Sequence, residues 1–139
     1  MKVKRILCAA LLIALAACVP AQASRLEQAW MTYEDYSGNR AEQTVTDEAT
    51  LDEIEEILTS AYSSPAQMEE CTLNCTLFVQ VKNGDIYDFA CATDGCPFIQ
   101  NRDTDQAYTL GDDFTRFWDI FWQVRQGMGL EASQVFGAW

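Results

Sequence analysis

Apolar and polar residues alternate in five short segments of this chain, and this two-residue period predicts β-strands that each bury one side. In the first segment, residues 26–34, Leu26 and Trp30 lie on one side, and Ala29 and Met31 lie on the other. The other predicted strands are residues 40–45, 76–81, 86–90 and 107–110.

A helical period follows the second predicted strand. The first predicted helix begins at the capping box Thr50-x-x-Glu53 and ends before Pro65. Its apolar side consists of Leu51, Ile54, Leu58 and Ala61. The acidic residues between them are expected to face solvent.

A second helical period lies near the end of the chain. It begins with Asp112 or Asp113 as the cap, and Gly127 or Gly129 is expected to end it. Its apolar stripe consists of five aromatic residues, Phe114, Phe117, Trp118, Phe121 and Trp122. Such a stripe is typical of a helix that packs on a core.

The order of these segments, β-β-α-β-β-β-α, predicts a single α+β domain over residues 26–139. We expect an antiparallel sheet with two helices packed on one face. A chain of this length forms one domain with a modest core.

The beginning of the chain is basic and then apolar. Lys2, Lys4 and Arg5 precede an apolar and small-residue run at positions 6–17. This run is shorter than the ~20 residues that a transmembrane helix needs. It is typical of an export signal that is removed, which predicts a signal peptide over residues 1–17.

The end of that run, Leu15-Ala16-Ala17-Cys18, resembles the lipobox of bacterial lipoproteins. The resemblance implies cleavage before Cys18, a diacylglycerol on its thiol and, with Val19 next, an outer-membrane address in diderm bacteria. Residues 18–25 would then be a short tether. The alternative is ordinary secretory cleavage after Ala21-Gln22-Ala23, which gives a signal of residues 1–23 and a soluble periplasmic or secreted protein.

Charge excludes two classes of partner. Three of the nine basic residues lie in the signal and all 21 acidic residues follow it, so the mature chain has a net charge of −15. Such a charge repels nucleic acid and anionic lipid surfaces, whereas it attracts a basic protein. The chain also has no histidine, which excludes His-dependent catalysis and His-containing zinc sites.

Four cysteines lie in the predicted domain, namely Cys71, Cys75, Cys91 and Cys96. In an exported protein an even set predicts disulfides, and four cysteines allow three pairings. A three-residue loop at Lys82-Asn83-Gly84 gives one apolar face to the hairpin and sets Cys75 opposite Cys91. We therefore predict two disulfides, Cys75–Cys91 and, outside it, Cys71–Cys96. The first falls at a hydrogen-bonded position, where a direct bridge fits less well.

The sequence gives weaker signals for redox chemistry, metal binding and docking. The cysteine spacings match neither the C-x-x-C redox motif nor a typical zinc knuckle. Asn101, Asp103, Asp105 and Asp112 have the spacing of an EF-hand calcium loop, but Gln106 stands where that loop needs glycine. Exposed aromatic residues could form a docking patch, for which the candidates are Trp118, Trp122 and Trp139.

Three functions remain open at this point. The first is a non-enzymatic envelope lipoprotein, anchored in the membrane through Cys18, that binds or supports an envelope protein. The second is a secreted acidic inhibitor or ligand of a basic extracellular protein. The third is a thiol–disulfide redox protein. No cofactor is predicted for any of them.

Overall fold

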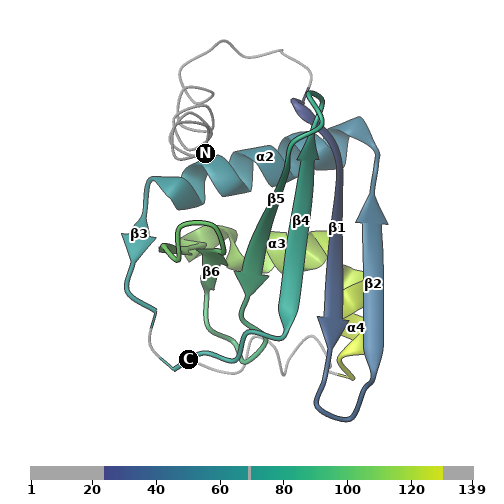
Figure 1. Cartoon of the computed structure of the whole chain (residues 1–139), viewed down its shortest axis with the longest axis vertical. Coiled ribbons are helices and arrows are strands. Elements are labelled where there is room, and N and C mark those ends of the chain that lie inside the picture. The colour runs from purple at the N-terminus through teal and green to yellow at the C-terminus, as the bar shows by residue number, and fades with distance from the viewer. Residues whose placement is uncertain (1–23, 69, 130–139) are drawn as a thin grey trace.

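The fold is built on one antiparallel sheet of seven strands, in the order β2-β1-β4-β5-β6-β7-β3 (Figure 1). The computed structural model describes residues 24–68 and 70–129. The strands are β1 Leu26–Glu34, β2 Arg40–Val45, β3 Pro65–Ala66, β4 Cys75–Val81, β5 Ile86–Cys91, β6 Phe98–Asn101 and β7 Ala107–Thr109. The predicted α+β class with an antiparallel sheet is confirmed. Two short strands, β3 and β6, were not predicted.

Helices cover one face of this sheet (Figure 1). They are α2 Glu48–Tyr62, the 3-10 turn η1 Gly111–Asp113, α3 Phe114–Ile120 and α4 Trp122–Gly127. α2 follows the edge strand β2 and leads into β3 at the opposite edge, so it crosses the width of the sheet. Between helices and sheet lies one core, whose largest fully buried side chains include Trp118, Phe89, Phe117, Phe121 and Met31.

The central hairpin β4–β5 has the predicted register. Cys75 lies opposite Cys91, Leu77 opposite Phe89 and Val79 opposite Tyr87. Gly84 has φ +94°, and the backbone N–H of Val81 donates to the carbonyl of Asp85 at 3.0 Å. Glycine is favoured in this left-handed conformation, and it closes the three-residue loop that fixes which side chains enter the core.

A bulge in β1 changes one predicted face. Leu26 pairs with Val81 and Gln28 with Gln80, so Glu27 is the extra residue in the ladder. The prediction that Leu26 shares a side with Trp30 was therefore wrong: Leu26 is buried together with Ala29 and Met31. A bulge shifts the alternation by one residue, which the sequence pattern does not reveal.

The sheet face opposite the helices carries an aromatic pair. The rings of Trp30 and Phe78 stack on neighbouring strands with centroids 5.1 Å apart and an interplanar angle of 14°. Both side chains are half-buried, and the amide of Gln28 donates to that of Gln80 beside them at 2.7 Å. Cross-strand pairs of this kind stabilise a sheet locally.

The cap of α2 lies three residues before the predicted one, Thr50. Asp47 is the N-cap, and its carboxylate accepts a hydrogen bond from the backbone N–H of Thr50 at 3.0 Å. The predicted capping box was wrong: Thr50 is not the cap, and the side chain of Glu53 binds Arg116 on α3. A tertiary ion pair thus replaces the local contact.

The entry of the chain into β1 is fastened to α2. The hydroxyl of Ser24 donates to Glu55 at 2.9 Å, and the backbone N–H of Arg25 donates to the same carboxylate oxygen at 3.0 Å. Ser24 is only 3% exposed. Ser24 and Arg25, which were predicted to be tether, therefore make contacts with the packed domain.

The predicted second helix is divided into two. α3 ends at Ile120 and α4 begins at Trp122, because Phe121 between them has φ −94° and ψ 41°, outside the helical region. Asp113, one of the two predicted caps, is the N-cap residue of α3, but its side chain makes no capping hydrogen bond. Trp118 and Trp122, four residues apart, were predicted to lie on one apolar stripe. Because the break lies between them, Trp118 is buried and Trp122 is exposed.

One disulfide is present among the described residues, where two were predicted. Cys71 and Cys96 are joined, with their Cα atoms 6.1 Å apart. Cys75 and Cys91 lie opposite each other but are free thiols, so the predicted Cys75–Cys91 bridge was wrong. The physical reason is their place in the ladder: at a hydrogen-bonded position the directly opposed Cβ atoms are about 5.5 Å apart, which exceeds the ~3.5–4.5 Å that a disulfide joins.

Candidate functional site

A groove of about 680 Å³ lies where the edge strand β2 meets α2 and α3. Carboxylates from separate elements line it: Asp47 and Glu53 at the start of α2, and Asp112 and Asp119 from the η1–α3 segment. We call it the acidic groove. The side chain of Trp122, 45% exposed, stands at its wall.

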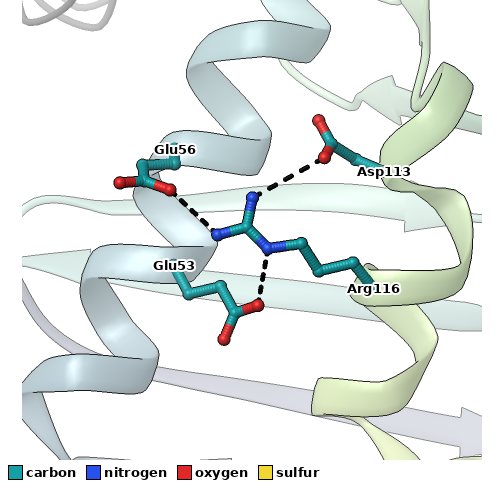
Figure 2. A network of polar contacts seen from close by, with 4 residues as sticks. All are labelled: Glu53, Glu56, Asp113 and Arg116. Atoms are coloured by element: carbon teal, nitrogen blue, oxygen red, sulfur yellow. Dashed lines mark hydrogen bonds and ion pairs between the residues drawn. The ribbon is translucent and has the colours of Figure 1, made fainter.

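The one cation in the groove lining is already held by acidic partners (Figure 2). Nε of Arg116 donates to Glu53 at 2.6 Å, and Nη2 donates to Glu56 at 2.9 Å. Nη1 lies 3.6 Å from a carboxylate oxygen of Asp113. The hydrogen bond to Glu56, and to a smaller extent the one to Glu53, raises the pKa of the guanidinium. Arg116 therefore fastens α3 to α2.

Carboxylates remain in excess after Arg116 is paired. Asp119 binds Arg125 at 2.9 Å, yet its side chain is 61% exposed. The pKa of Asp47 is lowered, chiefly by the side-chain and backbone hydrogen bonds with Thr50, which keeps it ionised. The groove thus presents negative charge beside an aromatic ring, which is a suitable surface for lysine or arginine side chains.

The predicted tryptophan patch is not formed as a unit. Trp118 is 1% exposed and packs edge-on against Phe117 at 5.5 Å, so it belongs to the core. Trp122 reaches the surface because the break at Phe121 turns α4 relative to α3. Trp139 lies outside the described residues, as does the predicted lipidation residue Cys18.

The residues with the spacing of a calcium loop are not brought together in the described part of the chain. The side-chain oxygen of Asn101 accepts the backbone N–H groups of Asp103 at 2.9 Å and Thr104 at 3.3 Å, and its amide donates to Tyr62 at 2.6 Å. Asn101 therefore shapes the loop. Asp112 lies in the acidic groove instead. Asp103, Asp105 and Asp112 form no cluster among the described residues, since spacing along the sequence does not by itself close a loop around an ion.

One group of three metal-type ligands occurs within residues 24–68 and 70–129, namely Cys71, Asp94 and Cys96. Both sulfurs are already in the disulfide, so neither is a thiolate that could bind a metal ion. Asp94 has a structural contact here, since its carboxylate accepts the backbone N–H of Thr72 at 2.6 Å.

Cys75 and Cys91 form a buried thiol pair between the sheet and the helices. Both are at most 1% exposed. Burial raises the pKa of the Cys91 thiol to about 12 and that of Cys75 further, where the neighbouring Cys91 adds to the effect. A thiol that keeps its proton is a poor nucleophile, so these residues act as small apolar core residues.

We expect Cys75 and Cys91 to resist iodoacetamide in the native protein at about pH 8, and to be alkylated only in denaturant. Their raised pKa values also mean that stability falls above about pH 8.5, since the unfolded thiols then lose protons that the folded protein keeps. Peptide mass mapping of native and denatured samples measures the labelling. Ser60→Cys, at an exposed position on α2, is the positive control. Rapid native labelling of Cys75 or Cys91 would contradict their assignment to the core.

Comparison of this chain with protein-family models, curated proteins and solved structures finds no match. Across the described residues, no helix is both long and apolar enough to cross a membrane.

The acidic groove was not predicted from the sequence. Its carboxylates come from residues about 60 positions apart, which the packing of α3 on α2 brings together. The acidic residues of α2 were interpreted as a solvated face. The available signal was the excess of acidic over basic residues, which indicates a charged surface but not where it lies.

Proposed function

We propose that this protein is an exported, non-enzymatic binding protein, held at the cell envelope by a lipid on Cys18, whose acidic groove takes a basic partner. The observation that supports binding is the groove itself. Its four carboxylates outnumber its one cation, which Glu53 and Glu56 already engage, and exposed Trp122 lies beside them. The support for export and anchoring is the signal and lipobox pattern at Leu15-Ala16-Ala17-Cys18.

Free secretion after cleavage behind Ala23 is the second candidate. Its support is the secretory cleavage pattern Ala21-Gln22-Ala23, which directly precedes Ser24. The molecule would then be a soluble ligand or inhibitor of a basic extracellular protein. A thiol–disulfide enzyme has less support, since Cys75 and Cys91 are buried and protonated.

Salt-dependent capture tests the binding function. The full chain, purified from the envelope, is expected to retain a basic partner at low salt and release it near 1 M NaCl, where the Debye length is about 3 Å. Asp112→Asn with Asp119→Asn removes two groove charges and should weaken capture. Glu48→Gln with Asp85→Asn removes two exposed carboxylates elsewhere and serves as the matched control.

The intact mass of the same purified protein distinguishes the two destinations. A chain that begins at Cys18 and carries a diacylglycerol supports the anchor, whereas a chain that begins at Ser24 supports free secretion. Failure to retain any basic protein at low salt, or equal loss of capture in both double variants, would contradict the proposed use of the groove.

A further inference from the structure

β2 is the outermost strand of the sheet, and within residues 24–68 and 70–129 no strand pairs with its outer edge (Figure 1). The direction of its backbone groups follows from the β1–β2 hairpin, where the N–H of Asp35 donates to the carbonyl of Asn39 at 3.0 Å. In an antiparallel ladder hydrogen-bonded pairs alternate, so Ala41, Gln43 and Val45 point their backbone groups toward β1. Glu42 and Thr44 point theirs away from the sheet.

This edge lacks three common forms of protection. Natural edge strands are often blunted by proline, lysine or a bulge. β2 contains no proline or lysine, and its pairing with β1 runs without a register shift from Ala29–Val45 to Glu34–Arg40. Its only cation, Arg40, is paired with Glu34 at 2.9 Å. The edge is therefore open to another strand.

We propose that a basic, extended segment of a partner protein adds to β2 as an eighth strand, which is the addition mode known for exposed sheet edges. This inference rests on the proposed function and names where and how the basic partner binds. Backbone groups of Glu42 and Thr44 would pair with the added strand. Those side chains of the added strand that point toward the helices would enter the acidic groove. β2 itself contributes Gln43, Thr44 and Val45 to the lining of this groove.

Charge favours a basic partner segment over a second copy of this chain as the added strand. On the open face of the sheet the added strand meets Glu42, and on the helix side it meets Asp119, with Trp122 beside it. The described residues carry 19 acidic and six basic side chains, so two copies would bring like charges together. Lysine or arginine on either face of the added strand finds a carboxylate instead.

The test uses a short peptide of alternating lysine and valine, capped at both ends, and fluorescence anisotropy with the full chain. Thr44→Pro removes one outward N–H of β2 without removing a bond to β1, since proline is tolerated at such edge positions. Thr44→Val keeps the N–H and is the matched control. We expect Thr44→Pro to weaken binding by about tenfold and Thr44→Val to change it little.

A second probe needs no change in the protein. The same peptide, N-methylated at alternate residues, keeps its charge but loses the donors of one edge, and it should bind about tenfold more weakly. Equal binding of both peptides, or equal binding by both Thr44 variants, would overturn strand addition while leaving the groove as a basic-partner site. No binding of the unmodified peptide at low salt would overturn the proposal together with the proposed function.

Discussion

Replacing Trp118 with alanine is expected to lower the free energy of unfolding by about 3–5 kcal/mol, the range found for large aromatic residues removed from a core. Trp118 is 1% exposed and contacts Phe117 edge-on, so its removal leaves a cavity that its neighbours fill only in part. Since single domains are stable by only about 5–15 kcal/mol, this variant should be close to unfolding. Urea denaturation followed by far-UV circular dichroism measures the change.

Trp122→Ala is the matched control for that experiment. Trp122 is also a helical tryptophan four residues away, but it is 45% exposed. We expect its removal to cost less than about 1 kcal/mol, as is usual for surface substitutions. Similar losses in the two variants would contradict the division of the aromatic stripe into a core part and a surface part.

Loss of the Cys71–Cys96 disulfide is expected to cost about 3 kcal/mol. The bridge spans a sequence separation of 25 residues, and closing a loop of this size restricts the unfolded chain by about that amount. Nearby hydrogen bonds, such as that from the backbone N–H of Thr93 to the carbonyl of Thr72 at 2.9 Å, hold the same two segments together. The double variant Cys71→Ser, Cys96→Ser should therefore fold, with a lower urea midpoint.

Two comparisons make this prediction specific. A thiol reductant should destabilise the wild-type protein as much as the double substitution does, and it should leave the variant unchanged. Cys75→Ala removes a buried thiol that is not bridged, so it should cost less, and reductant should still destabilise it. An equal response of the wild type and the double variant to reductant would contradict the assignment of the bridge.

The sequence predicted best where local signals agree. In the β4–β5 hairpin, the alternation of Leu77 and Val79 and the loop glycine Gly84 both require one register, and the structure has it. β6 was missed because Phe98–Asn101 is too short to show a period. The break at Phe121 was missed because the aromatic stripe keeps its helical spacing across it.

The candidate site was less predictable than the fold. The pairing of Cys75 with Cys91 was predicted correctly as a register but wrongly as a covalent bond, since opposition in a ladder does not by itself give the side-chain geometry of a bridge. The acidic groove depends on the docking of α3 against α2 through Arg116 and Glu53, a contact that no sequence pattern marks.

The order of strands in the sheet has a consequence for biogenesis. β1 pairs with β4, whose residues follow much later in the chain, and β3 pairs with β7. Contacts between distant segments slow folding, because long loops must close before the contacts form. Under the export that we propose, this delay helps to keep the chain unfolded for translocation, because β1 has no β4 partner until Val81 has been synthesised.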